Sequence, residues 1–195
     1  MLNIALFGPP GAGKGTQSAW LIPHFGLIHI APGDILREQI AEGTALGKMV
    51  SSYMDNGLLV PNQLVIAAVK EKMNRHCDAD GFLFDGYPRT PMQAEVLDQQ
   101  LAAQSRILDM VLFLKVAEEA SYERIKKRRK EIFRVDDQSE EKITTRFHQY
   151  YNTTLPVSEY YEKQNKLIHI NGEHGILNVR AHISKQVEDY LQRKS

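Results

Sequence analysis

A glycine-rich loop near the start of the chain limits what the chain can fold into. Residues 8–17 read GPPGAGKGTQ, and the glycines and Lys14 have the spacing G-x4-G-K. An apolar run, Leu2–Phe7, comes directly before the loop, and a segment of helical character follows at 16–24. Glycines let backbone N–H groups wrap a phosphate, and the N-terminus of the following helix adds a favourable dipole. The loop therefore predicts a phosphate-binding strand–loop–helix unit rather than an ordinary glycine turn.

The order of residues inside the loop predicts how a nucleoside triphosphate and its metal would be held. Lys14 can reach the β- and γ-phosphates. Gly15 follows the lysine, so the hydroxyl of Thr16 arrives one position later than in a general phosphate loop. A Mg²⁺ ion would then depend more on phosphates and water. Asp85, at the end of an apolar run, is the carboxylate expected to hold that water, although it could also serve as a turn or helix cap.

Short apolar runs alternate with segments of helical period along the whole chain. The candidate strands are Leu2–Phe7, 27–30, Gly81–Asp85, 110–116 and 167–170. Their continuous apolar character is typical of strands buried on both faces of a parallel sheet. Asn62 and Thr90 are expected to cap helices, and Pro91 occupies the first helical position after Thr90. The pattern predicts an α/β sandwich that binds ligands at the carboxyl ends of its strands.

Charge and composition exclude several classes of protein. The 24 basic and 24 acidic residues cancel, which argues against nucleic acid or an anionic membrane as partner. No apolar run approaches a membrane span, and the N-terminus lacks the features of a signal peptide, so we expect a cytoplasmic protein. Cys77 is the only cysteine, which leaves no pair for a disulfide and no cysteine cluster for zinc. Because free cysteines are usually buried, we expect Cys77 to be buried.

Arginines concentrate in one part of this neutral chain. Seven of the eleven residues from 124 to 134 are basic, and Arg124 and Arg128 share a helical face. Bound phosphate groups need such cations, and planar arginine groups suit them better than lysine. A solvated basic helix is the other interpretation, and it remains open for Lys126, Lys127, Arg129 and Lys130.

Four further motifs follow the loop in a fixed order. They are Gly33-Asp34-x-x-Arg37, then Gly57-Leu58-Leu59-Val60-Pro61, then Asp85-Gly86-Tyr87-Pro88-Arg89-Thr90 with Gln93, then Arg134-Val135-Asp136-Asp137 with Arg146 beyond it. Together with the GKGTQ form of the loop, they resemble the adenylate kinase family over nearly the whole chain.

The resemblance implies an architecture and a reaction. The fold would be a P-loop three-layer sandwich with a five-stranded parallel sheet, whose core comprises 1–30, 61–125 and 139–195. A monophosphate-binding flap (31–60) and a short lid (126–138) would be inserted into this core. The family transfers a phosphoryl group reversibly from ATP to AMP, giving two ADP, with Mg²⁺ carried by ATP and no zinc in the short-lid form. Its members are usually monomeric.

The resemblance also implies a role for particular residues. The catalytic group would be Lys14, Arg89, Arg134 and Arg146. The ATP-binding group would be Gly11, Ala12, Gly13, Lys14, Gly15, Thr16, Arg124, Arg128 and Gly175. The AMP-binding group would be Pro32, Arg37, Leu58, Leu59, Val60, Gly86, Tyr87, Pro88, Arg89, Gln93, Arg134 and Arg146. Arg37 could also be an ordinary surface residue, and Gly175 an ordinary loop glycine.

The sequence departs from the family pattern at the base site and in the lid. Ala31 and Pro32 replace a Ser-Thr pair, which removes a hydroxyl associated with the AMP base. Arg129 and Phe133 replace lid glycines, and one additional residue separates Arg134 from Arg146. Gln93 itself has two interpretations, because Thr90-x-x-Gln93 is also a capping box, in which the glutamine bonds to a backbone N–H rather than to adenine.

Three other functions remain as alternatives. The first is a UMP/CMP-type nucleoside-monophosphate kinase, which the missing Ser-Thr pair leaves open. The second is a P-loop switch that holds one nucleotide, although the two inserted segments and the surplus arginines exceed its needs. The third is a nucleic-acid-dependent ATPase, which the neutral charge and the lack of a stacking-aromatic platform disfavour.

Overall fold

One parallel sheet forms the centre of the molecule. The computed structural model describes residues 1–130 and 133–194, so residues 131 and 132 of the expected lid lie outside the described residues. The five strands have the order β2-β3-β1-β4-β5, with every neighbouring pair parallel. Their bounds are β1 Leu2–Phe7, β2 Ile28–Ile30, β3 Gly81–Asp85, β4 Met110–Lys115 and β5 Leu167–Asn171. The predicted α/β class and five-stranded sheet are confirmed, with strand ends that differ from the prediction by at most one residue.

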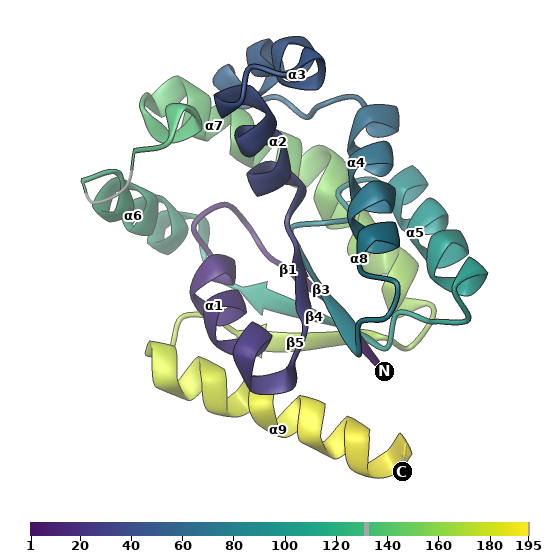
Figure 1. The fold of residues 1–195 in the computed structure, drawn as a ribbon. Coiled ribbons are helices and arrows are strands. Elements are labelled where there is room, and N and C mark those ends of the chain that lie inside the picture. The colour runs from purple at the N-terminus through teal and green to yellow at the C-terminus, as the bar shows by residue number, and fades with distance from the viewer. Residues whose placement is uncertain (131–132, 195) are drawn as a thin grey trace.

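Helices connect the strands and cover both faces of the sheet (Figure 1). They are α1 Lys14–Phe25, α2 Pro32–Ala41, α3 Ala45–Asp55, α4 Asn62–Arg75, α5 Pro91–Ala103, α6 Glu118–Arg129, α7 Glu140–Gln149, α8 Leu155–Glu162 and α9 Ile176–Lys194. A 3₁₀ turn, η1 (Val135–Asp137), precedes α7, and a π-helical turn, η2 (Tyr150–Thr154), joins α7 to α8.

Two hydrophobic cores, one on each face of the sheet, give the three layers. On β1, Ile4 and Leu6 face the core that includes residues of α1 and α9, while Ala5 and Phe7 face the core shared with α4, α5 and α8. This alternation follows from the two-residue period of a strand. The central strand β1 is buried along its whole length, as the sequence predicted. The edge strand β5 is only partly covered, and its residues His169 and Asn171 are exposed.

Of the two predicted helix caps, one is confirmed and one is wrong. Thr90 caps α5 as predicted, and its Oγ accepts a hydrogen bond from the backbone N–H of Gln93 at 3.2 Å. Asn62 does not cap α4, because Pro61 occupies the cap position and the Asn62 carboxamide instead contacts the side chains of Thr90 and Gln93.

The prediction that Cys77 is buried is wrong. Helix α4 ends at Arg75, so Cys77 falls in a surface turn and is exposed. Its backbone carbonyl, rather than its thiol, has the structural role: it accepts a hydrogen bond from the buried guanidinium of Arg106 at 2.7 Å.

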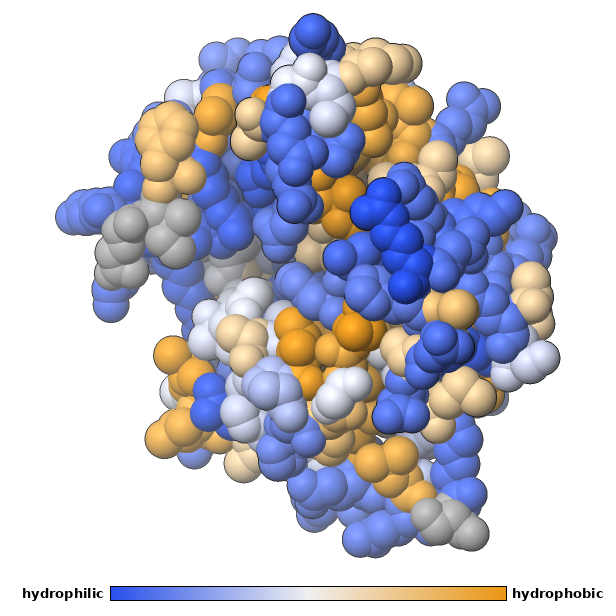
Figure 2. Space-filling view, viewed as in Figure 1, coloured by the Kyte–Doolittle hydropathy of each residue, from blue (hydrophilic) through white to orange (hydrophobic). Residues whose placement is uncertain are grey.

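Helices α2 and α3 lie apart from the sheet, beyond the carboxyl ends of the strands, on the side of the molecule where α7 also lies (Figure 1). The face of the molecule that is turned to the viewer in Figure 2 is hydrophilic over most of its area, and its apolar side chains form separate patches. In the part of the chain that the structure describes, no helix is both long and apolar enough to cross a membrane.

Candidate active site

The phosphate loop connects β1 to α1 at the carboxyl end of the central strand. Helix α1 begins at Lys14 itself, after Gly13, whose φ of 93° places it in the left-handed region. The Lys14 ammonium donates hydrogen bonds to the carbonyls of Gly8 at 2.7 Å and Pro9 at 2.9 Å, so it lies inside the curve of the loop. Burial lowers the pKa of Lys14 to about 7, against the attraction of Asp85 and with repulsion from Arg89 and Arg146. The negative charge of Asp85 therefore does not fully compensate the buried ammonium of Lys14.

The phosphate loop passes so close to α6 at Gly11 that only glycine fits there. The φ of Gly11 is +82°, and a Cβ built on it would lie 2.3 Å from the backbone oxygen of Ser121. Any side chain would displace the loop from α6. The glycine thus fixes the distance between the loop and the helix that carries Arg124 and Arg128.

Asp85 ends β3 beside the loop and is held by two residues from different elements. Its Oδ2 accepts a hydrogen bond from the hydroxyl of Ser18 on α1 at 2.8 Å and lies 3.5 Å from Nε2 of His29 on β2. Burial alone would raise the pKa of Asp85, but hydrogen bonds from His29 and Ser18 and the charge of Lys14 bring it below its ordinary value. Asp85 is therefore a carboxylate at neutral pH.

A cavity rich in arginine opens between α2, the segment after α3, the β3–α5 loop and α7. Arg37, Arg89, Arg134 and Arg146 all line it, although they are up to 109 positions apart in the sequence. The rest of the lining is Pro32, Gly33, Leu36, Met54, Gly57, Leu58, Leu59, Val60, Val65, Gly86, Tyr87, Gln93 and Asp136. We call this space the acceptor cavity. Its mixture of apolar walls and arginines suits a ligand with a ring at one end and a phosphate at the other.

A second, smaller cavity adjoins the acceptor cavity at the phosphate loop. Lys14, Gly8, Pro10 and Pro88 line it, and Arg89 and Arg146 line both cavities. Gly86 lies between the two: a Cβ built on it would be 3.9 Å from Cε of Lys14 and 3.3 Å from Nη2 of Arg89. The loop lysine and the arginines thus converge on one place.

Carboxylates already neutralise some of these arginines. Asp137, whose side chain is completely buried, accepts a hydrogen bond from Arg128 at 2.6 Å and binds Arg146, which also lies 3.0 Å from Asp136. Arg134 has no hydrogen bond or ion pair from its guanidinium to any described residue. Burial and the repulsion of Arg37 and Arg128 lower its pKa. An anion in the acceptor cavity would relieve that repulsion.

Comparison with known proteins agrees with this geometry. The family model described as "Adenylate kinase" matches residues 6–166. A curated adenylate kinase of Caulobacter vibrioides is 44% identical over 187 residues, covering 96% of this chain and 97% of the relative. One of Bacteroides thetaiotaomicron is 40% identical over 96% of this chain and 99% of the relative. One of Alkaliphilus oremlandii is 39% identical over 93% of this chain and 96% of the relative.

This chain belongs to the adenylate kinase family.

Within this member of the adenylate kinase family, Gln93 is both part of a cap and part of the cavity wall. Its Oε1 accepts a hydrogen bond from the backbone N–H of Arg89 at 2.8 Å, and its Nε2 donates to Oδ1 of Asn62 at 2.8 Å. A carboxamide oxygen has a second lone pair and its nitrogen a second hydrogen. Gln93 can therefore keep these contacts and still offer one acceptor and one donor to a ligand.

The predicted ATP-binding residues lie outside the acceptor cavity. Arg124 donates hydrogen bonds to the carbonyl of Gly172 at 2.8 Å and that of Ala12 at 3.4 Å, so it joins the phosphate loop to the β5–α9 loop. Gly175 is exposed in that β5–α9 loop, and Gly15 and Thr16 are exposed at the start of α1.

Several residues at the adenylate kinase site were not predicted from the sequence. Ser18 and His29 belong to no motif, and only the fold brings them to Asp85. Asn62 was interpreted as a helix cap, so its contact with Gln93 was missed. The apolar lining by Leu36, Met54 and Val65 could have been inferred from their positions beside the quoted motifs.

Proposed function

We propose that this chain catalyses reversible phosphoryl transfer from ATP to AMP, giving two molecules of ADP. The observation that carries the proposal is that Arg89 and Arg146 line both cavities, so that a donor held by the phosphate loop and an acceptor in the other cavity would meet at these two arginines. The names of the curated relatives support the same activity.

Each residue would act by position and charge. The loop N–H groups and Lys14 would hold the β- and γ-phosphates of ATP, with Arg124 and Arg128 nearby on α6. Arg37 and Arg89 would hold the AMP phosphate, and Arg134 and Arg146 would stabilise the charge that spreads over the transferring group. Gln93 would bond to the adenine edge, beside Pro32, the flap residues Leu58, Leu59 and Val60, and the loop residues Gly86, Tyr87 and Pro88.

Asp85 is the residue we propose to hold the hydrated Mg²⁺ of ATP. Hydrogen bonds from described residues reach only its Oδ2, which leaves Oδ1 to accept one from a metal-bound water. Its lowered pKa supports this assignment, because a hard cation and its water shell need an ionised carboxylate. The ion would neutralise phosphate oxygens of the donor.

We further propose that residues 31–60 form a flap and residues 126–138 a lid that close over the substrates. Arg37 belongs to the first segment and Arg134 to the second, so closure would bring both toward the transferring phosphate. Closure would also exclude water, which otherwise competes with AMP for the phosphoryl group. A bisubstrate mimic, two adenosines joined through phosphates, should slow amide hydrogen exchange in both segments. Unchanged exchange with the mimic bound would contradict closure.

The activity itself is tested by a coupled assay of ADP formation. With ATP and Mg²⁺ present, AMP should be the preferred acceptor over CMP and UMP. Protein that is folded by circular dichroism and produces no ADP from ATP and AMP would contradict the proposal. Equal rates with CMP or UMP would instead indicate a kinase of broader base specificity, as Pro32 leaves open. We propose a cytoplasmic monomer on the basis of the family, and sedimentation analysis tests the monomer.

A further inference from the structure

A groove of about 640 Å³ lies outside both cavities of the proposed reaction. Its floor is the carboxyl end of β4 and β5, where Phe113 pairs with His169 and Lys115 with Asn171 across the two strands. These four side chains share the face of the sheet opposite α1 and α9, because they alternate with Leu112, Leu114 and Ile170 of that core. The size of the groove lies in the range of small-molecule sites.

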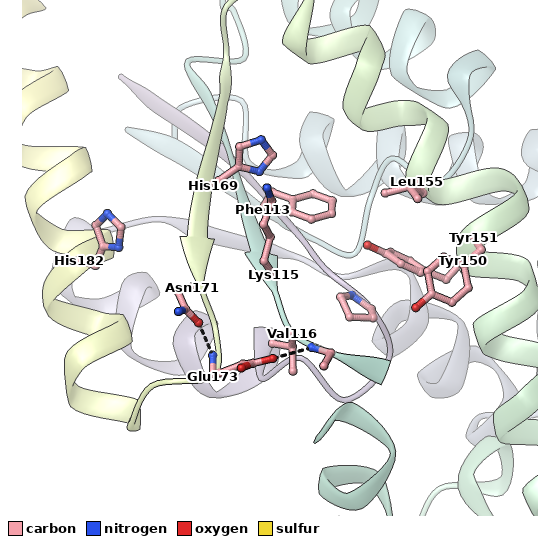
Figure 3. A pocket seen from close by; sticks show the side chains of 12 residues that line it. Phe113, Lys115, Val116, Tyr150, Tyr151, Leu155, His169, Asn171, Glu173 and His182 are labelled. Carbon is pink, nitrogen blue, oxygen red and sulfur yellow. Dashed lines mark hydrogen bonds between the residues drawn. The ribbon is translucent and has the colours of Figure 1, made fainter. Parts of the chain in front are cut away.

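Aromatic rings form two sides of the groove. On the strands, the ring of Phe113 contacts that of His169 edge to face, with centroids 5.6 Å apart. On the π-helical turn η2, Tyr150 and Tyr151 have centroids 5.2 Å apart, and Tyr151 is 40% exposed. Figure 3 shows the Phe113 ring extending toward the two tyrosines across the open space. A π-helical turn is an uncommon structure that often occurs at functional sites.

The polar groups of the groove are suited to a ligand that both donates and accepts hydrogen bonds. The carboxylate of Glu173 already accepts a hydrogen bond from the N–H of Ala117 at 2.9 Å. Oδ1 of Asn171 accepts one from the N–H of Glu173 at 3.0 Å, which leaves the Asn171 amide nitrogen as its donor to a ligand (Figure 3). The Lys115 ammonium and the His169 ring have no hydrogen bond to any residue in the described ranges. The same holds for the ring of His182, which belongs to α9 and lines the groove from beyond the edge strand β5 (Figure 3). Lys115 and Glu173 balance in charge. No arginine is among the described residues that line the groove, whereas Arg37, Arg89, Arg134 and Arg146 line the acceptor cavity. The groove therefore favours an uncharged ligand over a phosphate.

We propose that this groove is a second binding site, which takes an uncharged planar heterocycle with hydrogen-bonding edges, the chemistry of a nucleobase or nucleoside. The ring stacks against Tyr151 and Phe113, and its edge bonds to Lys115, Asn171 or the histidines. The groove is separate from the acceptor cavity, but Tyr150 lines both the groove and the cavity at the phosphate loop.

The test uses adenosine as the probe, on protein whose reaction cavities are saturated with the bisubstrate mimic. Imidazole signals of His169 and His182 are followed by NMR, and those of His24 and His76 serve as internal controls. Adenosine should shift the first pair saturably and leave the second pair unchanged. A parallel titration uses uridine. If the site accepts any base, uridine shifts the signals of His169 and His182; if the site is specific for purines, uridine leaves them unchanged. Ribose, which has no aromatic ring, should shift neither pair.

A matched pair of variants at Tyr151 distinguishes stacking from an unspecific effect. Tyr151→Ala should weaken adenosine binding by roughly tenfold, because the base loses the aromatic ring on which it stacks. Tyr151→Phe keeps the ring and should bind nearly as well as the original protein. The proposal is overturned if adenosine shifts His169 and His182 only when the mimic is absent. It is also overturned if ribose has the same effect, or if Tyr151→Ala binds adenosine unchanged.

Discussion

The two sides of the proposed reaction centre are built differently. On the donor side, the phosphate loop offers backbone N–H groups between β1 and α1, and its cation, Lys14, is bonded to carbonyls of the same loop. On the acceptor side, the cavity depends on side chains from several segments far apart in the sequence, including Arg37 on α2, Arg134 before η1 and Arg146 on α7. The difference indicates that a short stretch of sequence forms the phosphate loop itself, while the acceptor cavity forms only when distant segments of the fold come together.

Removal of Lys14 should have the largest effect and would affect the donor side first. Lys14→Ala deletes a charge aimed at the ligand phosphates, and we expect ADP formation to fall on the order of 10³-fold. Lys70→Ala, on the exposed side of α4, is the control and should remain fully active. Circular dichroism checks that both variants fold. Near-normal turnover of Lys14→Ala would show that the loop backbone holds the donor without its lysine.

Arg89→Ala tests the junction between the two sides. Because Arg89 lines both cavities, its loss should lower kcat by roughly 10³-fold, as for other arginines that stabilise a transferring phosphoryl group. Arg75→Ala is the control, since Arg75 lies on the surface and pairs with Glu71 one helical turn away. If Arg89→Ala raised only the KM for AMP and left kcat intact, Arg89 would bind the acceptor without stabilising the transfer.

Gln93→Ala should affect the acceptor side alone. We expect the apparent KM for AMP to rise roughly tenfold or more and the apparent KM for ATP to change little, because one buried hydrogen-bonding pair is lost. Selectivity for AMP over CMP and UMP should fall for the same reason. A lower melting temperature with unchanged AMP saturation and selectivity would mean that Gln93 is only a cap.

Asn62 tests how the Gln93 side chain is held in the wall of the acceptor cavity, and its effect should be smaller. Asn62→Ala removes the acceptor that orients Nε2 of Gln93 and should raise the constant for AMP by about threefold, since one hydrogen bond contributes about 1 kcal/mol. Asn62→Asp keeps an oxygen acceptor and should raise it less. Equal constants for all three proteins would show that Gln93 needs no support from Asn62.

The smallest expected effect is the uptake of a proton by Lys14 when ATP binds on the donor side. Its pKa is about 7 in the protein without ligand, below the ordinary 10.5, so at pH 8 most molecules carry it uncharged. Phosphates bound beside it raise this pKa again, so ATP binding at pH 8 should take up close to one proton. Calorimetry in two buffers of different ionisation enthalpy measures the uptake. The uptake should fade as the pH is lowered well below 7, and equal enthalpies in both buffers at pH 8 would contradict it.

The fold and the donor side were predictable because their signals are local. Apolar runs of strand length and the GKGTQ loop each lie within a few residues, so the sequence alone indicated the sheet and the loop. The motif arginines were also found, but their convergence on one cavity depends on how the segments fold. Ser18 and His29 beside Asp85, and Asn62 beside Gln93, could not be predicted, because each contact joins elements far apart in the sequence. The expectation for Cys77 was wrong, because a general tendency of free thiols says nothing about a particular surface turn.

The buried Asp137 has a consequence for the end of each catalytic cycle. A guanidinium left without a counter-ion in a desolvated site is costly, and departure of a nucleotide would leave several at once. Asp137 contacts both Arg128 and Arg146. In the proposed reaction it would be the anion that remains beside these arginines when the phosphates leave. In the proposed reaction, product departure would then exchange one negative partner of these arginines for another, and the cleft could empty without hydration of every arginine.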